Sequence, residues 1–373
     1  MSKASEMKVR ELLSIADIIV GGNRPQDIQI LDTTVYDQWL RDGSLGIGES
    51  YMEGKWGAVS LDQTMKHLIN HMDELEALVR KSPSLILYTT KLKLLNVQNK
   101  IGSKRVIEQH YDDDIELFKN MLDPYMQYSC GYWNFGAEDL TTAQRDKMRL
   151  IAEKMYLEPG MEILDIGSGF GGLANFLATE YMVKVTAVTL SKSQHEYALA
   201  HFAHPNITFV LQDYRDIVHK EYDRVVSVGT FEHIGIKNYK AFFKKVFALL
   251  KNDGFLLLHT IGSARTTTST DEWIDTYIFP GGQLPSTTQI VESIDEPYVI
   301  EDWHNFGENY SRTLHAWHNN LSQFWKDKAD KNFRMWEYYL LSCAGNFEAR
   351  SSVQLWQIVV SKKGIKGGYK SIR

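Results

Sequence analysis

The sequence predicts an α/β fold in which helices cover both faces of a parallel sheet, preceded by a small helical domain. From about Glu162 onward, short runs rich in Val, Ile and Leu alternate with helical stretches, and this alternation is typical of parallel sheets covered by helices. The first of these runs leads into a glycine-rich turn. The first hundred residues instead carry apolar side chains at helical spacing, which predicts helices there.

Each element is predicted from its own residues. The expected strands are residues 161–167, 184–190, 207–213, 223–229 and 254–262, and the helices between them include 193–203 and 239–251. Helices are also expected through 9–20 and 65–79. Between these last two, Gly43, Gly46 and Gly48 most simply make a turn or cap, because the lysine that a P-loop phosphate cradle requires does not follow them.

Length and composition bound the class of protein. With 373 residues, 43% hydrophobic and 24% charged, the chain is expected to form two globular domains, which we place at residues 1–100 and 101–373. Two cysteines, Cys130 and Cys343, support neither a disulfide scaffold nor a four-cysteine zinc site, and they fit a reducing compartment.

The same features point to a cytoplasmic protein. The N-terminal residues lack the pattern of a signal peptide, and no apolar run approaches the roughly 18 residues of a membrane span. The net charge of −6 argues against binding to nucleic acid.

Positive charge is concentrated in residues 81–105. They hold six Lys or Arg and no Asp or Glu, and Leu and Ile alternate with the lysines. As a helix this stretch would present a basic amphipathic surface suited to anionic lipid headgroups. The alternative is a solvated helix packed against its own domain.

The clearest motif is LDIGSGFGG at residues 164–172, which follows the first predicted strand. Gly167, Gly169 and Gly172 satisfy G-x-G-x-x-G, which lets the backbone approach a nucleotide closely. An NAD site would need an acidic residue at the end of the second strand, where the chain instead reads Thr-Leu-Ser. Asp165 before the glycines, with Asp213 and Tyr214 after the third strand, favours S-adenosylmethionine over a dinucleotide.

The loop at residues 123–133, DPYMQYSCGYW, surrounds Cys130 with aromatic residues and a methionine. Its proline and glycine make it a poor core strand, so we expect a loop that contacts a ligand. Together with this loop, the stretches SLGIGESYMEGKW, HYDDDIELFKNML, LDIGSGFGGLA, VLQDYRD, VSVGTFEHIG, LLHTIGS, WIDTYIFPGG, EDWHNFGENY and YYLLSCAGNF appear in one order along the chain. In these stretches the sequence closely resembles the bacterial cyclopropane-fatty-acyl-phospholipid synthases, relatives of the mycolic acid cyclopropane synthases. Ser168 and Phe170 depart from the Cys and Trp that are usual in the family.

The resemblance implies a Rossmann-like class I S-adenosylmethionine-dependent methyltransferase fold, with a seven-stranded, mostly parallel sheet. It implies that a methylene is added across the cis double bond of an unsaturated phospholipid acyl chain. The family's base is a bound bicarbonate ion, which removes a proton so that the ring can close. The family also implies a homodimer.

The site residues are carried over from the same resemblance. The catalytic set, chiefly bicarbonate ligands, is Cys130, Glu232, His259, the Ile261 backbone, Tyr310 and Cys343. The cofactor set is Tyr128, Ser129, Asp165, Gly167, Ser168, Gly169, Thr189, Leu190, Gln194, Asp213 and Tyr214. No metal ligand is expected.

Each catalytic residue also has a simpler interpretation. His259 is alternatively a strand-end histidine bonded to backbone, Glu232 a helix cap, Tyr310 a buried phenol and Cys130 a small core residue. Their joint occurrence on loops at one sheet edge favours the functional interpretation. Cys343 is read as structural, because methyl transfer from a sulfonium needs no covalent enzyme intermediate.

The C-terminal third holds six of the nine tryptophans, and its amphipathic helices are expected to line an acyl-chain channel as well as a core. Because the substrate lies in a bilayer, the basic stretch 81–105 and the N-terminal domain are expected to contact the membrane surface peripherally. The alternatives are a lipid C-methyltransferase that yields a methyl branch, a small-molecule methyltransferase, and a non-catalytic lipid-binding protein.

Overall fold

The computed structural model describes residues 3–81, 115–218, 220–267 and 270–373. The chain forms two compact units, each described here by itself. The first contains residues 1–111, 270–280 and 317–352, and the second contains 112–269, 281–316 and 353–373. The two later segments of the first unit had been assigned from the sequence to the catalytic domain, and the basic stretch 81–105 lies outside the described residues apart from its first residue.

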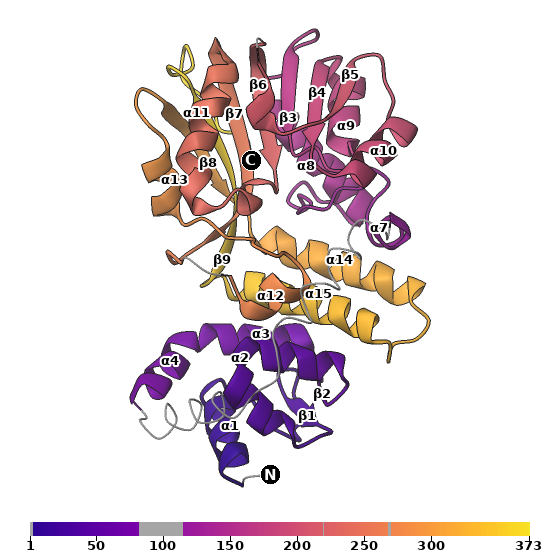
Figure 1. Ribbon diagram of the computed structural model, residues 1–373, viewed down its shortest axis with the longest axis vertical. Helices are drawn as coiled ribbons and strands as arrows, with labels where there is room; N and C mark the ends of the chain where they lie inside the picture. Colours follow the sequence, from indigo (N-terminus) through magenta and orange to yellow (C-terminus); the bar gives the residue numbers. More distant parts are fainter. Residues whose placement is uncertain (1–2, 82–114, 219, 268–269) are drawn as a thin grey trace. The chain divides into compact units, whose positions relative to one another are not determined.

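The first unit is mostly helical, as predicted, and it adds a small antiparallel sheet. Its elements are α1 (Lys3–Ile15), β1 (Ile28–Ile30), α2 (Val35–Met52), β2 (Trp56–Ala58), α3 (Leu61–Asn70), α4 (Met72–Lys81), α12 (Glu272–Tyr277) and α15 (Lys331–Ala349) (Figure 1). The helix predicted through residues 9–20 ends at Ile15, because the chain turns at Asp17 with φ 54°. The pattern at 65–79 forms two helices that are separated at His71.

The prediction of a turn or cap at Gly43, Gly46 and Gly48 is wrong for two of the three glycines. Only Gly43 leaves the helical conformation, with φ 56° and ψ −132°, and it kinks α2. Gly46 and Gly48 lie within the helix and are buried. A Cβ on Gly48 would lie 2.3 Å from the indole of Trp273, so this glycine allows α2 to pack closely against α12.

Helix α15 organises the rest of the first unit. The Arg334 guanidinium donates to the carbonyls of Tyr51 and Trp56 at 2.6 and 3.1 Å and stacks on the Tyr51 ring. The Tyr51 hydroxyl donates to Glu337 at 2.6 Å. On the same helix, a Cβ on Gly345 would lie 2.1 Å from the carbonyl oxygen of Asp62, so α15 meets α3 backbone to backbone.

We expect Gly345→Ala to destabilise the first unit by about 1–3 kcal/mol, because the added methyl would force α15 away from α3. The midpoint of thermal unfolding measures this change. The matched control is Gly57→Ala in the same unit, where an added Cβ meets nothing within 4 Å. Equal midpoints for the two variants would show that the close helix contact is not important for stability.

The second unit contains the predicted seven-stranded, mostly parallel sheet. Its strands are β3 (Glu162–Ile166), β4 (Lys184–Thr189), β5 (Ile207–Leu211), β6 (Tyr222–Val228), β7 (Leu250–Ser263), β8 (Val299–Asn305) and β9 (Val353–Ser361). Their order is β5-β4-β3-β6-β7-β9-β8, and β9 alone runs antiparallel to its neighbours. All five strands that were predicted from their own residues are confirmed.

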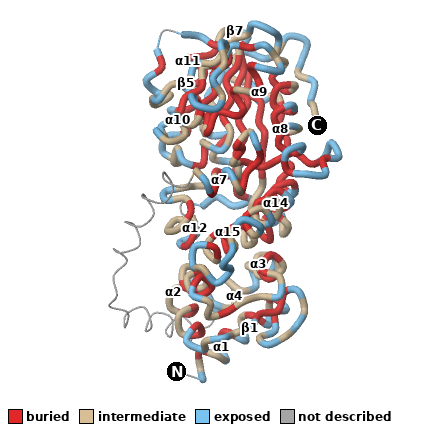
Figure 2. The backbone as a smooth tube through the Cα atoms, turned by 90° about the vertical axis from the view of Figure 1, so that its right-hand side faces the viewer, coloured by how far each residue is buried: buried red, intermediate tan, exposed pale blue. Residues whose placement is uncertain are grey.

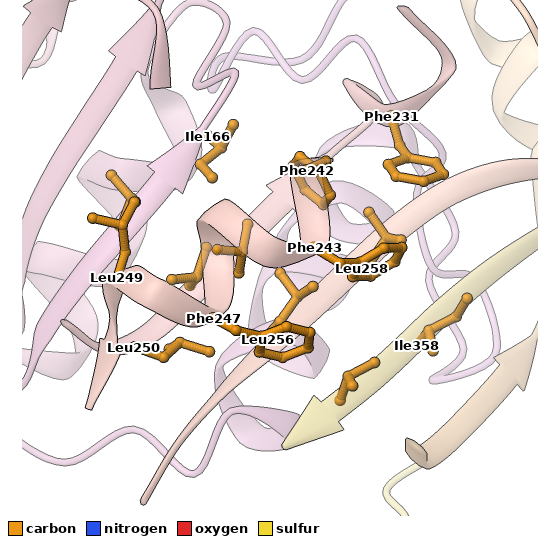
Figure 3. Close-up of a cluster of buried hydrophobic side chains, with 14 of the residues drawn as sticks. Ile166, Phe231, Phe242, Phe243, Phe247, Leu249, Leu250, Leu256, Leu258 and Ile358 are labelled. Atoms are coloured by element: carbon orange, nitrogen blue, oxygen red, sulfur yellow. The ribbon is translucent and has the colours of Figure 1, made fainter. Parts of the chain in front are cut away.

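Helices cover both faces of this sheet. The helices are α7 (Ile115–Met121), α8 (Leu140–Lys154), α9 (Gly172–Tyr181), α10 (Lys192–His201), α11 (Tyr239–Leu249), α13 (Thr287–Ser293) and the first part of α14 (Glu308–Phe324), with 3-10 turns η1 (Tyr214–Asp216), η2 (Phe231–His233) and η3 (Ile236–Asn238). Figure 2 shows the central strands of the sheet mostly in the red of buried residues, whereas the edge strand β5 has only intermediate and exposed residues. Phenylalanines of α11 pack on Leu256, Leu258 and Ile358 (Figure 3). The alternate strand residues, such as Leu257 and Val359, pack with α8 and α9 in a second cluster.

Among the described residues, no helix is long and apolar enough to span a membrane.

Candidate active site

Several of the predicted site residues of the second unit lie at or just after the carboxyl ends of its parallel strands. From β3 the chain proceeds to β4 and β5 on one side of the sheet, and then crosses to β6 on the other side. The carboxyl ends of β3 and β6 therefore flank the point where the strand order reverses, which is where open α/β sheets bind ligands.

The glycine loop has the backbone geometry that the motif predicts. Gly167 and Gly169 have φ values of 75° and 55°, in the region that favours glycine. A Cβ on Gly167 would lie 1.9 Å from Thr230 Oγ1, and one on Gly172 would lie 1.8 Å from the carbonyl oxygen of Tyr125. The third glycine of the motif thus allows the start of α9 to approach the loop before α8.

Two buried oxygens at this loop have no hydrogen-bond partner among the described residues. They are Asp165 Oδ2, at the end of β3, and Ser168 Oγ. Burial raises the pKa of Asp165 to about 7, while the Lys147 ammonium acts in the opposite direction. Because buried polar atoms are nearly always paired, these two oxygens fit a polar ligand such as the amino-acid end of a cofactor.

The ends of β4 and β5 carry the other predicted cofactor residues. Thr189 Oγ1 donates to Gln194 Oε1 at 3.1 Å, and the Leu190 side chain beside it is exposed. Asp213 accepts hydrogen bonds from the Arg215 side chain, which lower its pKa. Tyr214 packs on the α11 core, with its ring 5.5 Å from that of Phe242. These residues form one edge of the site, and Asp213 presents an ionised carboxylate there.

The loop at residues 123–133 is held in place by α8. The buried Lys147 ammonium donates to Gln127 Oε1 at 2.6 Å and to Ser129 Oγ at 2.9 Å. Gln144 Nε2 donates to the Ser129 carbonyl at 2.7 Å. Burial lowers the pKa of Lys147 to about 8. Of the two predicted cofactor residues in this loop, Ser129 is thus anchored directly, and Tyr128 packs its ring 5.3 Å from that of Phe118.

Cys130 is fully buried beside α14. Its Sγ lies 3.8 Å from Thr313 Oγ1, which also accepts hydrogen bonds from the Gly131 amide and the Trp133 indole. Burial raises the pKa of the Cys130 thiol well above its ordinary value. Cys130 is therefore a neutral thiol that lies beside the first turns of the helix carrying the buried Tyr310.

Glu232 and Ile261 are joined directly. The Ile261 amide on β7 donates to Glu232 Oε1 at 2.7 Å, so this amide, which was predicted as an anion ligand, orients the carboxyl group. The second oxygen, Oε2, is buried and has no hydrogen-bond partner in the part of the chain that the structure describes. Burial raises the pKa of Glu232 to about 7, against the lowering effect of the Ile261 amide. Oε2 is the oxygen that remains for a ligand.

His259 lies two residues before Ile261 on β7 and is buried. Burial, and then the charges of Lys147 and Lys154, lower its pKa well below the ordinary value. Its ring centroid is 5.8 Å from that of Phe306, which directly precedes α14. Glu232 is bonded to Ile261 on β7, and His259 on the same strand lies against Phe306 just before α14. Cys130 contacts Thr313 of α14, the helix that also carries Tyr310.

Cys343 belongs to the first unit, on α15. Burial and the charge of Asp271 raise the pKa of its thiol to about 12. A thiol that is neutral at physiological pH is a poor nucleophile, so this environment agrees with the structural interpretation of Cys343.

Three polar residues of the site were not identified from the sequence. They are Lys147, Thr313 and Gln357, and all three are fully buried. Lys147 stands in a helical pattern where a solvent-exposed lysine would be expected. The sequence offers one indication of a shared role for Gln144 and Lys147. They are three residues apart and therefore lie on the same face of a helix.

The chain is similar to known cyclopropane synthases over most of its length. Residues 98–358 match the family model described as mycolic acid cyclopropane synthetase. The chain is 44% identical over 370 residues to the cyclopropane-fatty-acyl-phospholipid synthase of Escherichia coli strain K12, covering 97% of this chain and 94% of the relative. It is 35% identical over 270 residues to cyclopropane mycolic acid synthase 2 of Mycobacterium bovis, covering 65% and 89%.

Solved structures agree with this relationship. The cyclopropane synthase MmaA2 from Mycobacterium tuberculosis aligns with a TM-score of 0.62 and 29% identity, covering 72% of this chain and all of that one. The mycolic acid cyclopropane synthase CmaA1, complexed with SAH and CTAB, aligns with the same TM-score and identity over 71% of this chain and 99% of that one. The predicted class I methyltransferase fold is thereby confirmed. The chain belongs to the mycolic acid cyclopropane synthetase family and is an S-adenosylmethionine-dependent methyltransferase.

Proposed function

We propose that the protein is a cyclopropane-fatty-acyl-phospholipid synthase, which adds a methylene from S-adenosylmethionine across the cis double bond of an unsaturated phospholipid acyl chain. The observation that carries this proposal is the 44% identity to the Escherichia coli enzyme of that name, which extends over 97% of the chain. The similarity therefore includes the N-terminal residues as well as the methyltransferase sheet.

The carboxyl ends of β3, β4 and β5 would hold S-adenosylmethionine. Asp165 Oδ2 and Ser168 Oγ are suited to the amino-acid end of the cofactor, and Asp213 and Tyr214 to its adenosine. Tyr128 and Ser129 would close over it, on the loop that Lys147 anchors. The cofactor supplies a methyl group activated by its sulfonium.

Cys130, Glu232, His259 and Tyr310 would together hold a bicarbonate ion, which would supply the base for ring closure. The Ile261 amide would act through Glu232, because it already donates to that carboxyl group. Glu232 Oε2 would accept the hydrogen of the bicarbonate hydroxyl and so increase the ion's basicity. Cys130 and His259 are neutral in this environment, so a hydrogen bond from either would leave the anion its charge. The Cys130 thiol would have to turn from the Gly131 carbonyl, to which it donates at 3.1 Å, toward the ion.

Burial of these residues would strengthen their hydrogen bonds to the ion and exclude water. Cys130, Glu232 and His259 all have little or no exposed surface. In surroundings of low dielectric constant, hydrogen bonds to an anion are stronger than in water, and water that could quench a carbocation is excluded. These residues would therefore favour ring closure over a methyl-branched or hydroxylated product.

The experiment that tests the proposal is mass spectrometry of acyl chains. Purified protein is mixed with S-adenosylmethionine and liposomes of cis-unsaturated phospholipid, with and without bicarbonate. Chains that gain one CH₂ and resist mild hydrogenation would establish cyclopropanation. A saturated, methyl-branched chain would instead identify a lipid C-methyltransferase, and cofactor binding without a lipid product would point to another substrate.

The lipid substrate also requires contact with a bilayer, and we propose that the basic stretch 81–105 provides it in a homodimer. Two such surfaces on one dimer would increase membrane avidity. Reversing the charges of Lys91, Lys93 and Lys100 is expected to weaken binding to anionic liposomes at low salt at least tenfold, in a sedimentation assay. The control is reversal of Lys362, Lys363 and Lys366, three lysines outside this stretch. Unchanged binding in the first variant would refute the assignment.

A further inference from the structure

Three polar side chains form a row across the sheet beneath the proposed anion pocket. In the strand register, Gln357 of β9 lies opposite His259 of β7 on one side and opposite His304 of β8 on the other. Directly opposed residues of adjacent strands point to the same face of a sheet. Gln357 is therefore the buried centre of a His–Gln–His row, and its side chain has no exposed surface.

Gln357 makes a specific contact with His259. The amide Nε2 of Gln357 lies 3.3 Å from Nδ1 of the imidazole. In this orientation of the amide, Nε2 is the donor, so Nδ1 is the acceptor. The other amide atom, Gln357 Oε1, is buried and has no hydrogen-bond partner among the described residues. A neutral imidazole carries one hydrogen, and that hydrogen is consequently on Nε2.

The surroundings keep His259 neutral. The charged and titratable groups that act on it are Lys147 and Lys154 of α8 and His304 of β8, and together with burial they lower its pKa. His304 is engaged elsewhere, because its Nδ1 lies 2.9 Å from Lys154 Nζ. No carboxylate is among the groups acting on His259, so its orientation depends on the amide of Gln357.

We propose that Gln357 is a positioning residue, which fixes His259 as the Nε2–H tautomer and presents that hydrogen to the anion of the site. This inference rests on the proposed role of His259 as a bicarbonate ligand. A neutral N–H donor stabilises the bound base without protonating it. A carboxylate in the place of Gln357 would instead stabilise the imidazolium, which could transfer its proton to the base and prevent it from acting.

The first test measures the tautomer itself. Protein labelled with ¹⁵N at histidine is studied by solid-state NMR, and the His259 signals are assigned by their loss in His259→Asn. We expect hydrogen on Nε2 and none on Nδ1 in the wild-type protein near pH 8. Hydrogen on Nδ1 would overturn the inference, since Gln357 would then accept through its carbonyl oxygen. This result does not depend on whether the protein forms cyclopropanes.

The second test uses Gln357→Glu, with Gln354→Glu on the same strand as the matched control. Gln354 Oε1 accepts from Asn305 and Trp356, and a glutamate can do the same. In Gln357→Glu we expect His259 to become protonated, and the acidic limb of the kcat–pH profile to move up by about one unit or more. In the control, neither should change.

An unmoved pH profile in a folded Gln357→Glu variant would overturn the inference. If that variant does not fold, the tautomer of the wild-type protein still decides. A wild-type protein that makes no cyclopropane chain would refute the proposed function, whereas the NMR result separately supports or refutes the role of Gln357.

Discussion

Glu232→Gln is expected to lower kcat for cyclopropane formation by roughly 10²–10⁴-fold, the range over which a positioned acid–base group acts. The substitution keeps an oxygen for the hydrogen bond from the Ile261 amide but replaces the accepting Oε2 with a donor. Product formation is measured by mass spectrometry of acyl chains at saturating S-adenosylmethionine. In the variant, the remaining activity should no longer depend on added bicarbonate.

The control for this prediction is Glu221→Gln, a glutamate that lies on the surface just before β6. It removes the same charge from the second unit without touching the pocket, so activity should be retained. If Glu232→Gln kept full, bicarbonate-dependent activity, Glu232 would have no role in holding the base.

The same carboxyl group should affect stability in a defined pH window. Its pKa is raised from 4.5 to about 7 by burial, so the folded protein holds a proton that the unfolded chain releases in that interval. The stabilisation is complete below about pH 4.5 and is lost as the pH rises through 7. Glu232→Gln should therefore unfold at a higher temperature than the wild type at pH 8, and this advantage should shrink towards pH 5.

Gly172→Ala is expected to weaken the binding of S-adenosylmethionine at least tenfold. The new Cβ would lie 1.8 Å from the carbonyl oxygen of Tyr125 and 3.0 Å from Gln127 Nε2. Backbone cannot yield as a flexible side chain would, so the loop that carries Ser129 must move away from the start of α9. Isothermal titration calorimetry measures the dissociation constant directly.

The comparison for Gly172→Ala is Gly160→Ala. Gly160 has φ 86°, and a Cβ there meets nothing within 4 Å. This variant bears the cost of a left-handed residue, about 1–2 kcal/mol of stability, without crowding the loop, so cofactor binding should persist. Similar dissociation constants in the two variants would contradict the proposed contact between loop and helix.

The parts of the fold that were predicted correctly share a physical feature. Strands β3, β4, β6 and β7 are largely buried and therefore read as short continuous apolar runs, each followed by a helix or turn. The edge strand β5 is less buried but keeps an apolar run. Strands β8 and β9 were not predicted from their own residues, because they follow α13 and α15 outside this alternation and because β8 carries Glu301, Asp302 and His304. Gly48 of α2 was misread for a similar reason, since it lies against Trp273, which is far away in the sequence.

The residues of the site likewise divide into those that can be recognised from their neighbours in the sequence and those that cannot. The glycine motif and Asp165 could be recognised locally, because a tight turn after a strand leaves a signature in adjacent residues. Cys130, Glu232, His259 and Tyr310 were identified through the family resemblance, and none would have been selected from its own neighbours. Lys147 and Gln357 were missed, because a lysine in a helix and a glutamine in a strand look like surface residues.

By itself, the sequence determined the class of fold, the end of the sheet where the ligand site lies, and the preference for S-adenosylmethionine, since all three depend on the succession of strands, helices and turns along the chain. Only the tertiary structure decided which polar groups are buried together and which hydrogen bonds they make. Gln357 meets His259 across 98 residues of chain, and Lys147 reaches Ser129 from a neighbouring helix. Such pairings follow from strand register and helix packing, which set the protonation states of the site through burial and nearby charge.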